Sequence, residues 1–292
     1  MTPVDDGQTL RVALPKGRMQ AEVFALLEAA GLKVRAGSRE YRPTIDGNQY
    51  SVKILKPQNI VEMLATGSRD VGFAGADWVA ELGLDVVEVL DTGLDPVRLV
   101  AAAPDALLDQ GRLRRRDGLV VASEYPCLTR SWLERAGLDA RLVRSYGATE
   151  VFPPDDADLI VDNTATGATL TANGLTIIDT LMTSSTRLFA NPRVLDQPVR
   201  RAALDDLKML LASVLEARQR VMLEVNVTSN RLETVCAILP CMREPTIAML
   251  HGNAGFAIKV AVPRRDLPRL IPLVKASGGT DLIVSALSQI VP

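Results

Sequence analysis

The stretch Asp158-Leu-Ile-Val-Asp162-Asn-Thr-Ala-Thr-Gly167-Ala-Thr-Leu170 points most directly to the fold of this chain. Its apolar start predicts a buried strand, in which Asp158, Ile160 and Asp162 share one face. The residues that follow predict a loop with hydroxyl groups and a glycine, and then the first turn of a helix. A strand that leads through such a loop into a helix is the unit of open α/β sheets, which bind ligands at the carboxyl edge of their strands.

The same loop predicts an anion site. Free backbone amides and the positive end of a helix dipole favour a phosphate group, and Gly167 permits close backbone approach. A carboxylate at Asp162, just before the loop, would accept hydrogen bonds from ribose hydroxyls. The pattern therefore indicates a sugar phosphate, and a capped helix after a buried strand, without a ligand, is the alternative. The P-loop and dinucleotide glycine fingerprints are absent.

Apolar runs alternate with amphipathic ones on both sides of this stretch. Strand–helix–strand repetition of this kind predicts a parallel sheet with crossover helices. The expected strands are 10–14, 50–55, 71–74, 97–103, 119–123, 141–146 and 159–161, and the expected helices are 20–30, 59–65, 128–136, one from about 167, and a long one over 201–223.

The last part of the chain has a different order of elements. We expect a strand at 222–227, a helix at 229–239, two strands joined by a hairpin at Gly252-Asn-Ala-Gly255, a helix from about 266, and a strand at 282–290. The order βαββαβ is that of the ferredoxin-like unit, so a separate small domain is predicted here.

Composition excludes several classes of protein. The chain has 292 residues, of which 47% are hydrophobic and 23% charged, and a length of this order suggests about two domains. The single histidine, His251, argues against zinc enzymes and histidine-dependent nucleophilic catalysis, and three cysteines argue against a disulfide framework. A net charge of −2 argues against a protein that coats nucleic acid, and we read the charged run Arg112–Asp117 as a solvated turn.

The N-terminal residues and the hydropathy of the chain indicate where in the cell the protein is expected. Asp5 and Asp6 lie where a signal peptide would carry positive charge, and no apolar run is long enough to cross a membrane. We expect a cytoplasmic protein that binds neither membranes nor nucleic acid.

Further motifs carry a resemblance that spans nearly the whole chain. Together with the loop, they resemble in order and spacing the ATP phosphoribosyltransferase family, the first enzyme of histidine biosynthesis. These motifs are Leu14-Pro-Lys-Gly-Arg18, Gly67-Ser-Arg-Asp-Val-Gly-Phe-Ala-Gly-Ala-Asp77, Ala122-Ser-Glu-Tyr-Pro126, Gly147-Ala-Thr-Glu150, Asn173-Gly-Leu175 and Thr183-Ser-Ser185. In the tail, Leu239-Pro240, Pro245-Thr246 and Ala276-Ser-Gly-Gly279 resemble the regulatory domain of the family's long form, which binds free histidine.

The resemblance implies an α/β fold with a two-lobed catalytic part like that of type II periplasmic binding proteins, and a C-terminal ferredoxin-like regulatory domain. Lobe I would comprise residues 1–97 with 186–217, lobe II residues 98–185, which carry the loop, and the regulatory domain residues 218–292.

The implied reaction joins adenine N1 of ATP to C1 of 5-phosphoribosyl 1-pyrophosphate in the presence of Mg²⁺. It gives N1-(5-phosphoribosyl)-ATP and pyrophosphate, and free L-histidine inhibits it. Adenine N1 loses no proton on attack, so positioning and electrostatics replace a general base. A homo-oligomer, dimer or hexamer, is expected from the same resemblance.

Site residues follow from the matching positions. Those implied for phosphoribosyl pyrophosphate are Asp158, Asp162, Thr164, Ala165, Thr166, Gly167, Ala168, Thr169 and Glu150, with Glu150 also a candidate metal contact. Those implied for ATP or pyrophosphate are Lys16, Arg18, Lys53, Lys56, Asp77 and Arg98. Those implied for histidine are Glu224, Asn226, Thr246, Ala276 and Gly278. Lys56-Pro-Gln-Asn59 departs from the family's usual Arg-Pro-Gln-Asp, and lysine lacks the bidentate fork of arginine.

Two other functions stay open at this point. One is a non-catalytic small-molecule sensor on the same two-lobed fold, and the other is a phosphoribosyltransferase with a different acceptor.

Overall fold

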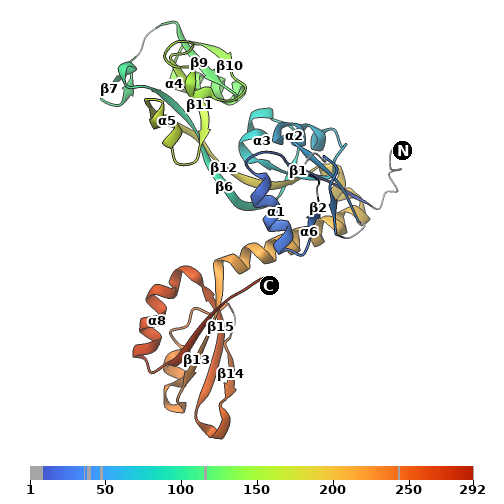
Figure 1. Ribbon diagram of the computed structural model, residues 1–292, viewed down its shortest axis with the longest axis vertical. Coiled ribbons are helices and arrows are strands. Elements are labelled where there is room, and N and C mark those ends of the chain that lie inside the picture. The colour runs from blue at the N-terminus through green and yellow to red at the C-terminus, as the bar shows by residue number, and fades with distance from the viewer. Residues whose placement is uncertain are drawn as a thin grey trace. The chain divides into compact units, whose positions relative to one another are not determined.

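The computed structural model describes residues 9–35, 37, 41–46, 49–114, 117–242 and 244–291 (Figure 1). The chain forms two compact units. Unit 1 runs to Asp205 without Ala29–Gly31, and unit 2 comprises Ala29–Gly31 with everything from Asp206 onward. No helix in these ranges is both long and apolar enough to cross a membrane.

Unit 1 is built on an eight-stranded sheet with the order β10-β9-β11-β6-β12-β5-β1-β4. Its strands are β1 (Leu10–Pro15), β4 (Tyr50–Leu55), β5 (Val71–Gly75), β6 (Val87–Pro104), β9 (Leu119–Ser123), β10 (Ala140–Arg144), β11 (Leu159–Thr164) and β12 (Leu175–Ala190). The helices are α1 (Gln20–Ala29), α2 (Pro57–Ala65), α3 (Ala76–Leu82), α4 (Pro126–Ala136) and α5 (Ala168–Ala172). Two small ribbons pair β2 (Val34–Arg35) with β3 (Thr44–Ile45) and β7 (Leu108–Asp109) with β8 (Arg112–Leu113).

The sheet is mixed, so the prediction of a parallel sheet was right only for its two ends. The triplets β5-β1-β4 and β10-β9-β11 are parallel. Between them, β6 and β12 run antiparallel to each other and to their outer neighbours. These two strands, of 18 and 16 residues, pass from one triplet to the other, and Figure 1 shows them joining two halves of unit 1. Periodicity within one strand does not reveal which strand pairs with it or in which direction, so the sequence pattern could not predict the antiparallel pair β6 and β12.

A polar contact joins these halves through α3 and the start of α4. Glu81 is 5% exposed, and its two carboxylate oxygens accept the backbone amides of Cys127 and Leu128, each at 2.9 Å. The rings of Trp78 and Tyr125 stack beside it with centroids 4.6 Å apart. Glu81 therefore caps the free amides at the N-terminus of α4 from a helix that follows β5, 46 residues earlier in the chain.

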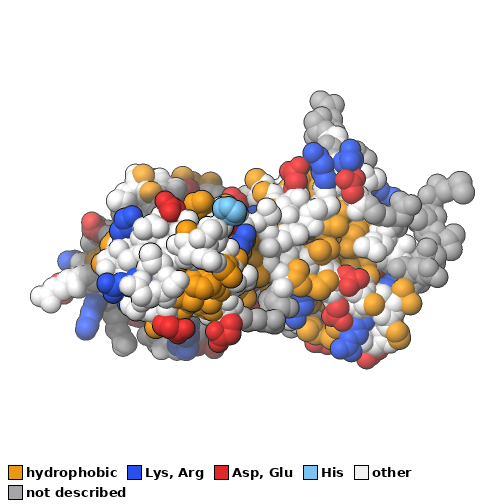
Figure 2. All heavy atoms as spheres, turned by 90° about the horizontal axis from the view of Figure 1, so that it is seen from below, with side chains coloured by type: hydrophobic (Ala, Val, Ile, Leu, Met, Phe, Trp, Pro, Cys, Tyr) orange, Lys and Arg blue, Asp and Glu red, His pale blue; other side chains and the backbone are white. Residues whose placement is uncertain are grey.

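Unit 2 contains a four-stranded antiparallel sheet with the order β14-β15-β13-β16. The elements are β13 (Arg220–Val227), α7 (Leu232–Cys236), β14 (Thr246–Met249), β15 (Phe256–Pro263), α8 (Leu267–Ala276) and β16 (Thr280–Ala286). One face of the sheet packs on Leu270 and Val274 of α8. His251 lies at the surface in the turn between β14 and β15 (Figure 2). Element order and strand order are those of the ferredoxin-like unit, as predicted.

Several predicted bounds were wrong. The long helix, α6 (Pro198–Gln219), begins three residues early and ends before 223, since β13 alternates buried and half-buried side chains from Arg220 onward. The predicted helix at 229–239 is a 3₁₀ turn followed by the short α7, and the last strand ends at Ala286. The charged run Arg112–Asp117 begins with paired β8 residues, and 115–116 lie outside the described ranges.

The Glu81 contact gives a stability prediction. Glu81→Ala should lower the free energy of unfolding by about 1–2 kcal/mol, because a helix loses its cap and two partly buried amides lose their buried acceptor. Tryptophan fluorescence can follow unit 1, since both tryptophans, Trp78 and Trp132, lie in it. Glu134→Ala, on the exposed face of α4, is the control and should change stability by less than about 0.5 kcal/mol. An equal loss in both variants would contradict the role given to Glu81.

Candidate functional site

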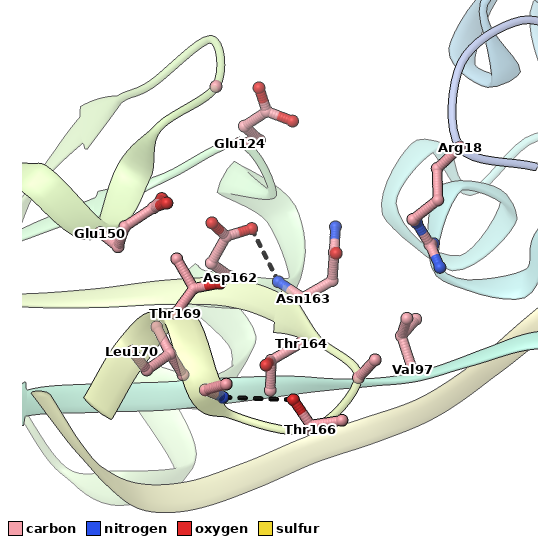
Figure 3. Close-up of a pocket in the computed structure, with 13 residues that line it drawn as sticks. Arg18, Val97, Glu124, Glu150, Asp162, Asn163, Thr164, Thr166, Thr169 and Leu170 are labelled. Atoms are coloured by element: carbon pink, nitrogen blue, oxygen red, sulfur yellow. Dashed lines mark hydrogen bonds between the residues drawn. The ribbon is translucent and has the colours of Figure 1, made fainter. Parts of the chain in front are cut away.

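A pocket of about 360 Å³ opens in unit 1 at the end of β11 (Figure 3). It brings together residues from β6, β9–α4, β10–β11, the loop after β11 and the turn after β1. The lining residues are Arg18, Val97, Glu124, Gly147, Glu150, Asp162, Asn163, Thr164, Ala165, Thr166, Ala168, Thr169 and Leu170.

The loop after β11 is shaped by its own hydroxyls. Thr164 accepts the amide of Gly167 at 2.9 Å, and Thr166 accepts the amide of Ala168 at 3.3 Å, the bond drawn in Figure 3. Gly167 has φ of +85°, in the left-handed region that favours glycine. These local bonds turn the chain directly from the strand into α5, which explains why the sequence located the loop correctly.

This turn leaves several amides available to a ligand. Within the described part of the chain, the amides of Ala165, Thr166, Thr169 and Leu170 have no recorded protein acceptor. All four residues line the pocket. Converging backbone N–H groups without partners form an anion-binding cradle, so this wall of the pocket is suited to a phosphate.

The neighbouring wall is acidic. Burial, and to a smaller extent the charges of Glu124 and Glu150, raise the pKa of Asp162 to about 6, against hydrogen bonds from the Asn163 amide and Thr149. Burial likewise raises the pKa of Glu124, which Lys56 and Arg144 oppose. Figure 3 shows the three carboxylates around one opening. Such a wall can accept hydrogen bonds from sugar hydroxyls, and it disfavours negative charge.

A hydrogen-bonded chain of side chains runs behind the pocket. Ser184 donates to Asp77 Oδ1 at 2.7 Å, Tyr125 donates to Asp77 Oδ2 at 2.6 Å, and Asn163 Nδ2 donates to the Tyr125 oxygen at 2.8 Å. Asp77 and Tyr125 are buried. A Cβ at Gly75 would collide with Asp77 Oδ1, so glycine at that position leaves room for this carboxylate to fold back over the start of α3.

Of the predicted basic residues, the structure brings only Arg18 into the pocket lining. Its Nη1 lies 3.7 Å from Asp95 Oδ1, and Figure 3 shows it facing the opening across from Asn163. Lys16 donates to the Tyr41 hydroxyl at 2.9 Å and lies over that ring. Arg98 follows the lining residue Val97 on β6, so strand alternation turns it to the other side.

Lys53 and Lys56 lie outside the lining residues as well. Lys53 is on β4, and the charge of Arg69, burial and the charge of Arg42 lower its pKa. Lys56 precedes α2 and is exposed. Its effect on the pKa of Glu124 nevertheless shows that it is electrostatically coupled to the acidic wall.

Two predicted acidic residues are occupied elsewhere. Asp158 accepts the amide of Val120 at 2.8 Å at the other end of β11, about 13 Å along the strand from Asp162. Both oxygens of Asp77 accept bonds from protein side chains, as described above. Neither residue lines the pocket, whereas Glu150 and every predicted loop residue except Gly167 do.

Sequence reasoning missed five lining residues: Val97, Glu124, Gly147, Asn163 and Leu170. All of these except Val97 stood inside quoted motifs, but a motif does not say which of its side chains faces a ligand. Within the described ranges, no group of three or more His, Cys, Asp or Glu side chains is arranged to hold a metal ion.

In unit 2, three of the residues predicted to bind histidine share the open face of the sheet. Glu224 pairs with Lys259 at 3.1 Å, and Asn226 donates to Asp281 at 3.1 Å. Thr246 lies opposite Lys259 in register and lines a cavity of about 350 Å³. Ala276 is the last residue of α8, which covers the other face, and Gly278 follows two residues later.

Comparison with known proteins agrees with these features. The family model described as ATP phosphoribosyltransferase matches residues 56–213, and that described as HisG, C-terminal domain, matches residues 217–289. The chain is 37% identical over 289 residues to the ATP phosphoribosyltransferase of Pelotomaculum thermopropionicum, which covers 97% of this chain and 99% of that protein. It is 34% identical over 292 residues to that of Chlorobium phaeovibrioides, with 98% and 99% covered.

A solved structure shows the same catalytic fold. The ATP phosphoribosyl transferase (HisG:HisZ) complex from Thermotoga maritima is similar with a TM-score of 0.60 and 26% identity, over 70% of this chain and 99% of that chain. The predicted fold class is therefore confirmed, with a two-lobed, periplasmic-binding-protein-like part and a C-terminal domain. The chain belongs to the ATP phosphoribosyltransferase family of histidine biosynthesis, whose members are pentosyltransferases.

Proposed function

We propose that this enzyme joins adenine N1 of ATP to C1 of 5-phosphoribosyl 1-pyrophosphate in the pocket at the end of β11. The observation that carries the proposal is the loop at 164–169, whose unpaired amides adjoin the Asp162 carboxylate. This pairing suits a sugar phosphate, with the 5′-phosphate on the amides and the ribose hydroxyls on Asp162. Family membership favours this enzyme over a non-catalytic sensor.

In the reaction, the N1 lone pair forms the bond to C1 while the C1–oxygen bond breaks and its electrons leave with pyrophosphate. The chain's part is to orient both substrates and to stabilise charge. Arg18 faces the pocket from the side opposite Asp162 and would attract the pyrophosphate. Glu124, Glu150 and Asp162 would stabilise the positive charge that develops at the ribose.

Mg²⁺ fits this site as a companion of the substrate. Since the described residues offer no cluster of three protein ligands, the ion would be held by the pyrophosphate, with Glu150 or Glu124 as a carboxylate ligand. When bound, Mg²⁺ neutralises charge on the departing pyrophosphate.

Histidine feedback and oligomerisation are the finer parts of the proposal. We assign inhibitor binding to residues 218–292, on the open face that carries Glu224, Asn226 and Thr246, and catalysis to lobes formed by 1–97 with 186–217 and by 98–185. The match of residues 217–289 to the family's C-terminal domain supports this division. The expected assembly is a homo-oligomer.

Activity is tested by mixing the protein with ATP, phosphoribosyl pyrophosphate, Mg²⁺ and pyrophosphatase. We expect phosphoribosyl-ATP to form. Thr164→Val, which removes the hydroxyl that holds the Gly167 amide, should raise the KM for phosphoribosyl pyrophosphate by about tenfold and leave that for ATP unchanged. Thr176→Val, an exposed threonine bonded to Asp105, is the matched control. Absence of product with the unmodified chain would refute the proposed function.

The raised pKa of Asp162 predicts a pH dependence. Because this pKa is about 6, the carboxylate gains a proton as the pH falls through that value, and it then loses its charge as an acceptor for ribose hydroxyls. The kcat/KM for phosphoribosyl pyrophosphate should therefore fall below this pH. Asp162→Asn should give a lower kcat/KM that depends less on pH. The substrate phosphates titrate in the same way with both proteins, so a comparison of the two pH profiles isolates the contribution of Asp162. Parallel profiles would show that Asp162 is not the titrating group.

Inhibition gives another prediction. Asn226→Ala and Thr246→Ala should each raise the histidine concentration for half-maximal inhibition by about tenfold, since each removes a hydrogen bond to the ligand. The kcat/KM without histidine should stay unchanged. Ser285→Ala, opposite Met222 on the same sheet, is the control. Unaltered inhibition in both variants would place the inhibitor elsewhere.

A further inference from the structure

Asn163 lines the pocket but takes no part in the phosphate-binding loop. Its backbone amide donates to its neighbour Asp162, and its side-chain Nδ2 donates to the Tyr125 oxygen at 2.8 Å. The remaining polar atom of the side chain, Oδ1, has no recorded donor among the described residues.

The orientation of this amide is forced by the residues behind it. Asp77 accepts a hydroxyl proton on each oxygen, from Tyr125 and from Ser184. A phenol has one hydroxyl hydrogen, and Tyr125 donates it in the hydrogen bond to Asp77. The Tyr125 oxygen can therefore only accept a hydrogen bond from a further partner. Burial and the nearby Asp77 carboxylate raise the pKa of Tyr125 above its usual value, so the phenol keeps this proton.

Only the NH₂ end of Asn163 can therefore face Tyr125. The reversed amide would set two acceptor oxygens against each other at a buried site, which is costly. Oδ1 consequently turns away from Tyr125 and is presented to the pocket as a fixed hydrogen-bond acceptor. Such an acceptor recognises a donor on the ligand.

The proposed reaction offers two kinds of donor near this point, the hydroxyls of the ribose and the 6-amino group of adenine. Asp162 already serves the hydroxyls in that proposal. C1 adjoins the C2 hydroxyl, so adenine N1 must arrive next to the group that Asp162 holds. The 6-amino group is on the carbon beside N1, so it also lies near the group that Asp162 holds. Asn163 is the next residue after Asp162, and the Cα atoms of adjacent residues lie about 3.8 Å apart. Asn163 is thus placed to meet the amino group when N1 faces C1.

We propose that Asn163 Oδ1 accepts a hydrogen bond from the 6-amino group of ATP and makes the site specific for a 6-aminopurine, with Tyr125 and Asp77 as positioning residues. This inference rests on the proposed function. Attack through N1 places positive charge on the aminopurine, so the bond to Oδ1 strengthens as the reaction proceeds. It should contribute to the transition state more than to ground-state binding.

The test compares ATP with purine riboside 5′-triphosphate, which keeps N1 but lacks the 6-amino group. Asn163→Leu should lower kcat/KM for ATP by about tenfold and change that for the analogue by less than about twofold, so that the preference for ATP collapses. The analogue serves as the internal control for folding and for all other contacts. The KM for phosphoribosyl pyrophosphate should not change.

Tyr125→Phe separates positioning from contact. It removes the oxygen that fixes the amide while leaving Asn163 in place, so the preference for ATP should weaken without a change in the KM for phosphoribosyl pyrophosphate. Thermal unfolding of both variants checks that the fold is retained.

Three outcomes would overturn the inference while leaving the enzyme assignment intact. The first is that Asn163→Leu lowers kcat/KM equally for ATP and the analogue. The second is that Asn163→Leu instead raises the KM for phosphoribosyl pyrophosphate. The third is that Tyr125→Phe keeps the full preference for ATP. Failure of the unmodified chain to form phosphoribosyl-ATP would be the separate failure of the proposed function, and the inference would fall with it.

Discussion

Two carboxylates of α3 hold the pocket of this enzyme in shape. Glu81 caps the N-terminus of α4, and Asp77 receives the hydroxyls of Tyr125 and Ser184. Both are buried, where a carboxylate without hydrogen-bond donors would be strongly unfavourable. Glu81 is satisfied only when α3 lies against the first turn of α4, and Asp77 only when α3 lies against Tyr125 and Ser184. The two halves of unit 1 are therefore held together by polar groups that need one another.

This constraint extends to the chemistry. Tyr125 is held by Asp77 and in turn holds Asn163, the residue that follows Asp162 on β11. Asp162 of the acidic wall, Asn163 and the amide-lined loop lie on consecutive residues of β11 and the turn after it. In the proposed reaction, substrate orientation therefore depends on contacts made behind the pocket. A long antiparallel pair, β6 and β12, carries the chain between the halves, and its register shifts at several points.

The pocket separates its charges. Unpaired amides and Arg18 favour the phosphates, whereas three carboxylates favour hydroxyls and developing positive charge. An active site for displacement of pyrophosphate by a neutral nucleophile needs this arrangement, because negative charge leaves from one side of C1 while positive charge grows on the other. The proposed reaction requires no imidazole, in keeping with a chain whose single histidine lies at the surface of unit 2.

The sequence by itself determined the loop at 164–169, Asp162 before it, the ferredoxin-like order of unit 2 and the family. These features are encoded by neighbours: Thr164 reaches the Gly167 amide three residues away, and strand periodicity needs only a few residues. Only the tertiary structure decided that the sheet is mixed, that Glu124 adjoins Asp162, that Asp77 is occupied by Tyr125 and Ser184, and that Asn163 presents its carbonyl. The side-chain hydrogen bonds among these contacts join residues 38 to 107 positions apart, and partners at such separations are chosen by folding and burial, which no local pattern records.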